Sequence, residues 1–501
     1  MSDLPQGWAT ATLNDLLGAD GLFSDGDWVE SKDQDPDGTN RLLQLADIGD
    51  GFFVDKSSRY VNDEKFSSLN CTELKEGDVL IARMPAPLGR ACLLPAMPQR
   101  CLTVVDVAVF RVGGTGVSNK WLMHFLNSST LRREMELNSS GTTRKRISRG
   151  KLGEILLSIP PVAEQIRIAT KLDELMAQVN TLKACIDDIP KLLKRFRQSV
   201  LAAAVSGRLT EEWRGSAQLT SIRALLNEIA MERSDLKARK ILKANVGRFD
   251  AVDELYPLPC ASWEWVCFDQ ISKNDNNALK AGPFGSALKK SDCVQAGYKV
   301  YGQEQVISGD ENLVTYFIDE NKFKELEACR VGAEDILISL VGTIGKVLVL
   351  SKKAEIGIIN PRLVKISVHP DVSKSYLKLY LDSEVAHGFF KRFSHGGTME
   401  ILNLGILREL PIPLPSIAEQ TEIVRRVEQL FAFADQLETR VKATQARVNG
   451  LTQSILTKAF RGELVQQDAN DEPAGVLLER IKAQRAAAPK AKRGRRPAMV
   501  G

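Results

Sequence analysis

Hydrophobic residues between positions 172 and 200 recur in alternating steps of three and four. This spacing puts them on one face of an α-helix and predicts a coiled-coil seam that extends over four heptads. A shift of 255 residues gives a second seam with the same period between positions 427 and 455. The predicted seam residues are Leu172, Leu175, Val179, Leu182, Ile186, Leu193, Phe196, Val427, Leu430, Leu437, Val441, Val448, Leu451 and Ile455.

Residues that favour helix ends flank both seams. Prolines at 160–161 and 413–415 precede them, and Gly207 and Gly462 follow them. Pro190 lies inside the first seam, where it predicts a kink or one missing hydrogen bond because proline has no N–H. The pattern therefore predicts two helices of about 40 residues, each roughly 60 Å long at 1.5 Å per residue.

The simplest arrangement pairs these two helices with each other, because a helix with such an apolar stripe needs a partner. A globular segment precedes each helix, so antiparallel pairing would put one segment at each end, and parallel pairing would bring them together. We favour the antiparallel pairing. The alternative, in which each seam is only a core helix of its own domain, fits less well with nine consecutive seam positions.

The sequence is duplicated. Residues 152–209 align with residues 407–464 without a gap. Shared letters include Ala-Glu-Gln at 163–165 and 418–420, Gln-Ser at 198–199 and 453–454, and Leu-Leu-x-x-Ile at 225–229 and 477–481. A looser match reaches upstream, where Trp8 corresponds to Trp263. Each half therefore consists of a globular head, a long helix and a shorter helix.

The two heads, called head one and head two below, resemble each other far less than the helices do. This is expected if the helices form a common framework and the two heads have the same type of function with different specifics. Short β-rich runs at 78–83, 103–112, 335–341, 346–351 and 356–368 precede helical pieces at 119–138 and 373–392. We expect each head to be a compact α/β or α+β unit with a curved sheet.

The predicted fold class is α+β, with two α/β heads separated by two long helices that form an antiparallel coiled coil, and with internal duplication. The predicted segments are head one at 1–150, a central helix region at 151–215, a helical linker at 216–255, head two at 256–405, a C-terminal helix region at 406–465, and a short helix with a basic tail at 466–501.

Composition excludes several classes of protein. The 67 basic and 63 acidic residues nearly balance, so the net charge of +4 only weakly suggests an anionic partner. The eight cysteines form no CxxC pair and only four histidines are present, so we expect no metal site and free thiols in a reducing cytoplasm. We also expect no membrane segment, since no stretch of about 18 apolar residues occurs.

No catalytic motif stands out. The segment Gly-Thr-Ile-Gly-Lys at 342–346 lacks the spacing and the Ser or Thr of a P-loop, and no Gly-x-Ser-x-Gly or His-Glu-x-x-His occurs. We therefore expect a recognition protein without catalytic residues.

Candidate DNA contacts are loops that place Arg or Lys beside glycine or a small polar residue. Glycine lets the backbone approach a phosphate, and the cation adds charge or a bidentate contact to guanine. The candidates are Arg83, Arg90, Arg144, Lys145, Arg146, Lys289, Lys290, Lys346 and Arg362, with a further loop at 395–398 and a basic tail at 490–496. For any one of these residues, an ordinary solvated turn is the alternative.

The helix-start blocks Pro-Pro-Val-Ala-Glu-Gln-Ile (160–166) and Leu-Pro-Ser-Ile-Ala-Glu-Gln (414–420) resemble the corresponding motif of type I restriction–modification specificity subunits. Segments 192–201, 422–432 and 451–464 are similar to the framework of the K-like (type IA) branch of that family. The resemblance covers the whole order of head, helix, head and helix, and it is much more specific in the helices than in the heads.

The resemblance implies that each head is a target-recognition domain that reads one half of a bipartite site in double-stranded DNA. It implies two modification subunits, which dock on the helices and carry S-adenosylmethionine, and two restriction subunits, which use ATP and Mg. This chain would then direct adenine methylation or restriction with no cofactor of its own.

Two other functions stay open at this point. A coiled-coil scaffold that binds only protein predicts no sequence-dependent retention of DNA. A self-contained DNA enzyme predicts turnover by the purified chain alone.

Overall fold

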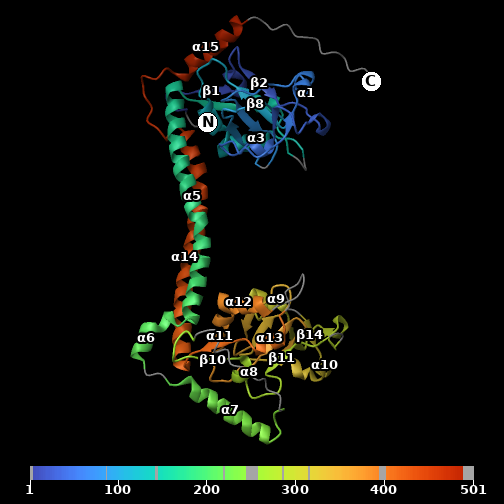
Figure 1. Ribbon diagram of the computed structural model, residues 1–501. Coiled ribbons are helices and arrows are strands. Elements are labelled where there is room, and N and C mark those ends of the chain that lie inside the picture. Colours follow the sequence, from blue (N-terminus) through green and yellow to red (C-terminus); the bar gives the residue numbers. More distant parts are fainter. Residues whose placement is uncertain are drawn as a thin grey trace. The chain divides into compact units, whose positions relative to one another are not determined.

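The computed structural model describes residues 4–85, 87–141, 145–217, 220–243, 258–284, 287–313, 316–393 and 402–488. The chain divides into two compact units, one made of residues 1–187 and 442–501 and the other of residues 188–441. Each unit contains one head and parts of both long helices (Figure 1). The six segment boundaries given above stay predictions.

Head one contains two sheets. Its strands are β2 (Leu22–Asp25), β3 (Asn40–Leu43), β4 (Tyr60–Val61), β5 (Val79–Ala82), β6 (Ala91–Leu93), β7 (Cys101–Thr103) and β8 (Val107–Arg111). The order β2-β8-β5-β6 forms an antiparallel sheet, and β4-β3-β7 forms a second sheet in which β3 and β7 run parallel. Two further strands, β1 (Ala9–Thr12) and β9 (Leu156–Ile159), pair with each other and join the head to its helix.

Head two repeats this strand order and adds two strands to its second sheet. Its strands are β11 (Leu279–Ala281), β12 (Cys293–Val294), β13 (Tyr298–Tyr301), β14 (Tyr316–Ile318), β15 (Arg330–Val331), β16 (Ile336–Ser339), β17 (Val347–Val349), β18 (Gly357–Ile359) and β19 (Leu363–Ile366). The sheets are β11-β19-β16-β17 and β12-β14-β13-β18-β15, with β13 and β18 parallel and with β12 and β15 as the added strands. Strands β10 (Glu264–Val266) and β20 (Ile412–Leu414) correspond to β1 and β9. The duplication therefore includes the heads, although their sequences have diverged.

The four helices of head one have counterparts in head two, which has two additional helices. Head one has α1 (Asp63–Ser68), α2 (Asn119–Leu126), α3 (Ser129–Leu137) and α4 (Arg149–Gly153). Head two has the additional helices α8 (Phe268–Ile271) and α9 (Gln303–Ser308) and the counterparts α10 (Glu320–Glu325), α11 (Lys374–Leu381), α12 (Glu384–Phe393) and α13 (Leu404–Arg408). The helical region expected at 119–138 is two helices, because the Ser128 hydroxyl accepts a hydrogen bond from the Leu131 N–H at 3.3 Å and starts a new one.

The expected curved sheet of each head is two sheets. The run expected at 103–112 is interrupted by a turn at 104–106, and the run expected at 356–368 by a turn at 360–362. Each turn carries the chain from one sheet to the other, because β7 pairs with β3 whereas β8 pairs with β2 and β5. A run of β-forming residues does not reveal such a change of partner.

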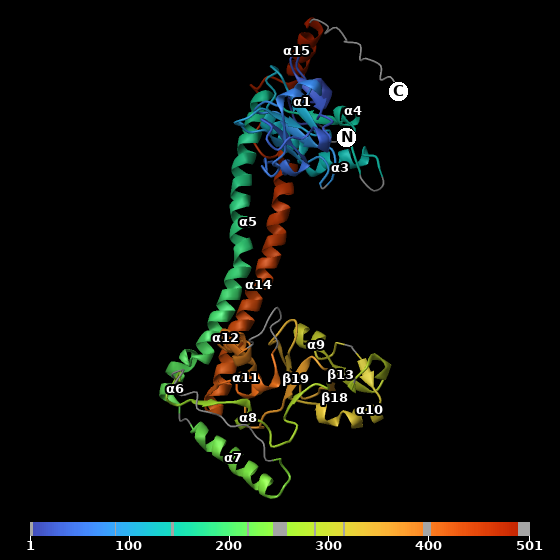
Figure 2. The same cartoon turned by 45° about the vertical axis from the view of Figure 1, so that its right-hand side comes forward.

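The two predicted long helices are α5 (Val162–Val205) and α14 (Ile417–Ala459), and they pair antiparallel, as expected (Figures 1 and 2). In the first unit, Gln445 near the end of α14 donates to Asp187 of α5 at 2.5 Å. In the second unit, Arg197 near the end of α5 forms an ion pair with Asp435 at 2.8 Å. Helix α5 continues through Pro190.

Buried seam residues recur at a spacing of seven in both helices. They are Leu172, Val179, Ile186 and Leu193 in α5, and Val427 and Val448 in α14. Leu175, Phe196, Leu430, Leu437, Val441 and Ile455 are half-buried. Leu182 and Leu451 are 50% and 40% exposed. One of the two heptad positions is thus covered more completely than the other.

Each head packs against the start of its own long helix and the end of the other one. The core of head one includes Ile168 and Leu172 of α5 together with Leu456 and Ala459 of α14. The core of head two includes Ile423 and Val427 of α14 and, from α5, Val200, Leu201, Ala204 and Val205. The antiparallel pairing therefore supplies each head with the same kind of two-helix support.

Three shorter helices complete the chain: α6 (Glu211–Ser216), α7 (Ile222–Ala238) and α15 (Ala474–Ala487). Leu477 and Ile481 of α15 enter the core of head one, and Ile222 of α7 enters the core of head two. None of the helices in the described part of the chain combines the length and the apolar content that a membrane span needs.

The duplicated Ala-Glu-Gln motif forms the joint between each head and its helix. The Trp8 indole donates to Glu164 at 3.0 Å, and the Trp263 indole donates to Glu419 at 3.0 Å. All four side chains are buried. These contacts explain why the tryptophan and the glutamate recur at the same offset.

The glutamine of the motif completes the joint. Gln165 accepts a bond from the Ser118 N–H at 2.9 Å and donates to the Pro160 carbonyl oxygen at 2.9 Å. Gln420 makes the same two bonds. It accepts a bond from the N–H of Ser373, the N-cap residue of α11, at 2.9 Å and donates to the Pro415 carbonyl oxygen at 2.8 Å. Buried amides with both ends satisfied fix a unique geometry, so each head has one orientation on its helix start.

Candidate nucleic-acid interface

Both heads have a concave surface at the same place in the fold. The head-one concavity has a volume of about 860 Å³ and is lined by the segment after β2, the residues after β3 and the β7–β8 turn, including Asp27, Trp28, Lys32, Gln44, Arg59 and Asp106. The head-two concavity has a volume of about 340 Å³ and is lined by the segment after β11, the residues after β13 and the β18–β19 turn, including Lys289, Lys290, Gln303, Tyr316, Asn360 and Arg362. Because the strand orders match, the two concavities are equivalent.

A glycine fixes the first lining segment in both heads. The Gly26 N–H donates to the Val107 carbonyl at 2.8 Å, and the Gly282 N–H donates to the Leu363 carbonyl at 2.9 Å. A side chain at Gly26 would collide with the Val104 carbonyl, and the backbone of the β18–β19 turn blocks position 282 in the same way. Only glycine allows this close approach, so the segment and the turn keep a fixed relation.

The two concavities differ in charge. Three acidic residues and two basic residues line the head-one concavity, whereas one acidic residue, Glu304, and three basic residues line the head-two concavity. An equivalent surface with a different set of donors and acceptors suits ligands of one kind that differ in detail.

In head one, three of the predicted DNA contacts have partners within the protein. Arg83 is 3% exposed, pairs with Asp25 at 2.8 Å and donates to the Val105 carbonyl. Arg146 donates to the same carbonyl at 3.2 Å. Arg90 donates to the carbonyl oxygens of Leu45 and of Ile48, at 2.7 and 2.6 Å. These cations therefore support the turn and the segment that line the head-one concavity.

The other predicted DNA contacts lie differently. Lys145 is exposed, and Arg144, the loop at 395–398 and the basic tail lie outside the described residues. In head two, Lys289, Lys290 and Arg362 are exposed and line the head-two concavity. Lys346 is exposed in the β16–β17 turn. The assignment of all these residues to DNA contact stays a prediction.

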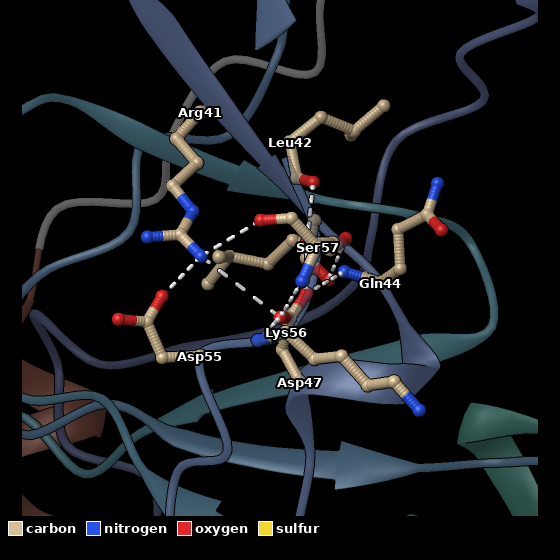
Figure 3. Close-up of polar contacts among 9 residues, drawn as sticks. Arg41, Leu42, Gln44, Asp47, Asp55, Lys56 and Ser57 are labelled. Atoms are coloured by element: carbon tan, nitrogen blue, oxygen red, sulfur yellow. Dashed lines mark hydrogen bonds and ion pairs between the residues drawn. The ribbon is translucent and has the colours of Figure 1, made fainter. Parts of the chain in front are cut away.

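A buried carboxylate holds the second lining segment of head one (Figure 3). Asp47 accepts hydrogen bonds from the backbone N–H groups of Gln44 at 2.7 Å, Lys56 at 2.8 Å and Ser57 at 2.7 Å, and also from the Ser57 hydroxyl. Burial acts to raise the pKa of Asp47, but these hydrogen bonds outweigh it, and the pKa is lowered. Asp47 therefore stays ionised and holds the segment at 44–57 in place.

Arg41 extends this network. It donates to the Ser57 carbonyl at 2.9 Å and forms an ion pair with Asp55 (Figure 3). Head two uses a neutral residue at the equivalent place, because Gln305 accepts a hydrogen bond from the Gly302 N–H at 2.8 Å. The segment behind each concavity is thus held in both heads by backbone N–H groups that donate to a side chain, to a carboxylate in head one and to an amide in head two.

One titratable group in the head-one concavity has a pKa close to neutral. Burial raises the pKa of the Asp27 carboxyl to about 6, although a hydrogen bond from the Thr72 N–H at 3.0 Å acts in the opposite direction. Asp27 therefore changes its charge between mildly acidic and neutral pH.

Trp28 and Phe284 were not among the residues predicted from sequence. Each is an exposed aromatic residue two positions after the glycine that fixes the first lining segment. In the sequence, both follow a glycine in a short shared pattern, Gly-Asp-Trp at 26–28 and Gly-Pro-Phe at 282–284. These two segments are 256 positions apart, whereas the long helices repeat at 255. A repeat search at a single fixed offset does not find this pattern.

Among the described residues, no three His, Cys, Asp or Glu side chains gather in a way that could hold a metal ion. Seven of the nine charged side chains that line the two concavities are exposed, and Asp27 and Asp106 are half-buried. Their arrangement suits binding by charge, hydrogen bonds and apolar contact.

Comparison with known proteins agrees with this geometry. Residues 5–191 and 285–444 match the family described as the type I restriction modification DNA specificity domain. The chain is similar to the EcoBI specificity subunit of Escherichia coli, with 36% identity over 70% of this chain and 69% of that protein. It is similar to the EcoKI specificity subunit of Escherichia coli strain K12, with 32% identity over 73% of this chain and 72% of that protein.

Two solved structures share the fold. A chain from a structural study of complex assembly and conformational transition in the type I R-M system has a TM-score of 0.62 and 18% identity, over 93% of this chain and 100% of that one. The HsdS subunit from Thermoanaerobacter tengcongensis has a TM-score of 0.55 and 18% identity, over 92% of this chain and 98% of that one.

Proposed function

This chain belongs to the family of type I restriction–modification DNA specificity subunits, and on that premise we propose that each head reads one half of a bipartite site in double-stranded DNA. In this proposal the coiled coil of α5 and α14 sets the distance between the two half-sites. The chain directs adenine methylation or restriction and catalyses neither reaction.

The observation that carries the proposal is the repetition of one head fold with two different concavities. The same strand order and the same Trp–Glu–Gln joint occur in both heads. The residues that line the two concavities differ in charge and shape. One scaffold with two linings is what two unrelated half-sites require, since base edges are distinguished by their pattern of donors, acceptors and methyl groups.

A specificity subunit of a type I system assembles with DNA and with the other subunits of that system. We propose that two modification subunits, which carry S-adenosylmethionine, dock on the long helices. We further propose that two restriction subunits, which use ATP and Mg, complete the assembly. This chain then needs no cofactor of its own.

The test is a comparison of DNA methylation in the host with and without this chain, by single-molecule sequencing. We expect a split motif with a fixed gap and methyladenine on both strands to vanish when the chain is deleted. If no methylated motif depends on the chain, and the purified complex selects no sequence from random DNA, a scaffold that binds only protein explains the chain better.

A further inference from the structure

Two aromatic side chains at equivalent places in the heads are mostly exposed to water. Trp28 is 67% exposed and Phe284 is 84% exposed. Single exposed hydrophobic residues are common on protein surfaces and usually need no explanation. Here the same exposure recurs two residues after equivalent glycines, in two heads whose other surface residues have diverged, so a shared role is the simpler reading.

The backbone that carries each ring is fixed to the sheet. In head one, the Gly26 N–H bonds to Val107 and the Asp27 N–H donates to the Thr103 carbonyl at 2.7 Å. In head two, the Gly282 N–H makes the equivalent bond to Leu363. The backbone next to each ring is therefore hydrogen-bonded to the sheet, so the starting point of each side chain does not depend on the conformation of a long loop.

Cationic side chains line both concavities, and Trp28 is itself a lining residue of the head-one concavity. Trp28 lines the head-one concavity with Lys32 and Arg59, and its indole N–H donates to Glu30 at 3.4 Å. In head two, Lys289 and Lys290, five and six positions after Phe284 in the sequence, line the head-two concavity. An apolar ring beside cations matches the surface of DNA, where the bases are apolar in part and the backbone is anionic.

The difference between the two linings favours DNA over a shared protein partner. A subunit that docked on both heads would meet an excess of acidic residues in one concavity and an excess of basic residues in the other. Two half-sites with different base sequences need surfaces of this kind: a common contact type, with different donors and acceptors around it.

We propose that Trp28 and Phe284 are specificity-determining residues whose rings contact the bases of their own half-site, Trp28 in head one and Phe284 in head two. This inference rests on the proposed function. Lys32 and Arg59, and in head two Lys289 and Lys290, hold the phosphates next to the contacted bases. The rings supply apolar contact, for which thymine methyl groups and base faces are the partners.

The test uses the complex of the full chain with its modification subunits and a library of random duplex DNA, and the retained DNA is sequenced. Trp28→Ala should reduce discrimination on the order of tenfold at one or more base pairs of the head-one half-motif. The head-two half-motif should stay unchanged, which also shows that the variant is folded. Phe284→Ala should give the reverse pattern, and Trp28→Phe should keep most of the head-one discrimination.

Phe52→Ala is the matched control, because Phe52 is an aromatic residue of head one that is 58% exposed and does not line the concavity. It should change neither half-motif. Two unchanged half-motifs in both Trp28→Ala and Phe284→Ala, or equal weakening of all sequences, would overturn the inference. If Trp28→Ala retains no DNA, restored selection by Trp28→Phe supports the inference, and no selection by Trp28→Phe contradicts it.

The outcome for the wild-type complex separates this inference from the proposed function. If the wild type selects a split motif and the alanine variants do not alter it, only the role of the rings is wrong. If the wild type selects no motif, the proposed function fails, and the inference fails with it.

Discussion

The two joints between heads and helices contain the same residues, but they are not equally complete. In both, a tryptophan indole donates to a buried glutamate at 3.0 Å. In the second joint, Glu419 also accepts bonds from the Thr210 hydroxyl at 2.8 Å and from Arg214 at 2.9 Å. In the first joint, the Oε1 atom of Glu164 is buried and has no hydrogen-bond partner among the described residues.

This difference appears in the titration of the first glutamate. Burial raises the pKa of Glu164 above its ordinary value, although the bond from Trp8 and the charge of Arg167 act to lower it. The bond from tryptophan to glutamate is thus repeated in both joints, whereas the additional hydrogen bonds to the glutamate from Thr210 and Arg214 occur only in the second. The tryptophan and the glutamate therefore fix the position of the head on its helix, since the charge of Glu164 is only partly compensated.

The largest expected effect comes from removing the tryptophan of a joint. Trp263→Ala should lower the free energy of unfolding by about 3–5 kcal/mol, because a fully buried indole and the bond to Glu419 are both lost. Hydrogen exchange of peptides from residues 258–414 measures this. Trp28→Ala is the control: Trp28 is 67% exposed, so the change should be within about 0.5 kcal/mol.

The next largest effect on stability distinguishes Glu419 from Glu164. Glu419→Gln should destabilise the second unit by about 2 kcal/mol, because Arg214, with 18% of its side chain exposed, loses its ionic partner. Chemical denaturation at neutral pH, followed by hydrogen exchange in head two, measures the loss. An unchanged stability would show that the ion pair contributes nothing beyond the hydrogen bonds that glutamine keeps.

The corresponding change in head one should have the opposite sign or none. Because the folded pKa of Glu164 is raised, the wild-type stability falls as the pH rises from the ordinary value of 4.5 through the folded pKa. Glu164→Gln removes this loss, so at pH 7 it should be neutral or stabilising by up to about 1 kcal/mol. Denaturation midpoints between pH 4 and pH 8 measure the difference, which should grow with pH; a destabilised variant at pH 7 would contradict the account.

The smallest expected effect concerns Asp27. Its folded pKa of about 6 lies above the ordinary value of 3.8, so its contribution to stability falls as the pH rises through that window. Asp27→Asn should show a flatter pH dependence of the unfolding free energy between pH 4 and pH 6.5 than the wild type, measured by urea denaturation. Identical pH profiles would mean that Asp27 titrates normally.

The framework of the molecule could be predicted from sequence. The seam period fixed the two long helices, and the gapless repeat with Gly207 and Gly462 gave their ends. The position of the heads before the helices left both pairings possible; we favoured the antiparallel one, and the structure confirms it. The helices and their ends are local or periodic features, so they leave a direct trace in the order of residues.

The concavities could be predicted only in part. Loops with Arg or Lys beside glycine pointed to Lys289 and Arg362, which line the head-two concavity. The same rule picked Arg83 and Arg90, whose partners are backbone carbonyls within head one. Sequence shows that a cation is present but not whether a carbonyl lies within reach, since that depends on strands distant in the chain.

We propose that the two joints accept either head and that each head carries its own specificity. The most direct test replaces residues 4–159 with residues 258–414, so that both positions carry head two, and determines the methylated motif in cells that contain the modification subunits. We expect a split motif made of two head-two half-motifs, with no trace of the head-one half-motif. Methylation of the original motif, or of a motif that head two does not read in the wild type, would contradict it.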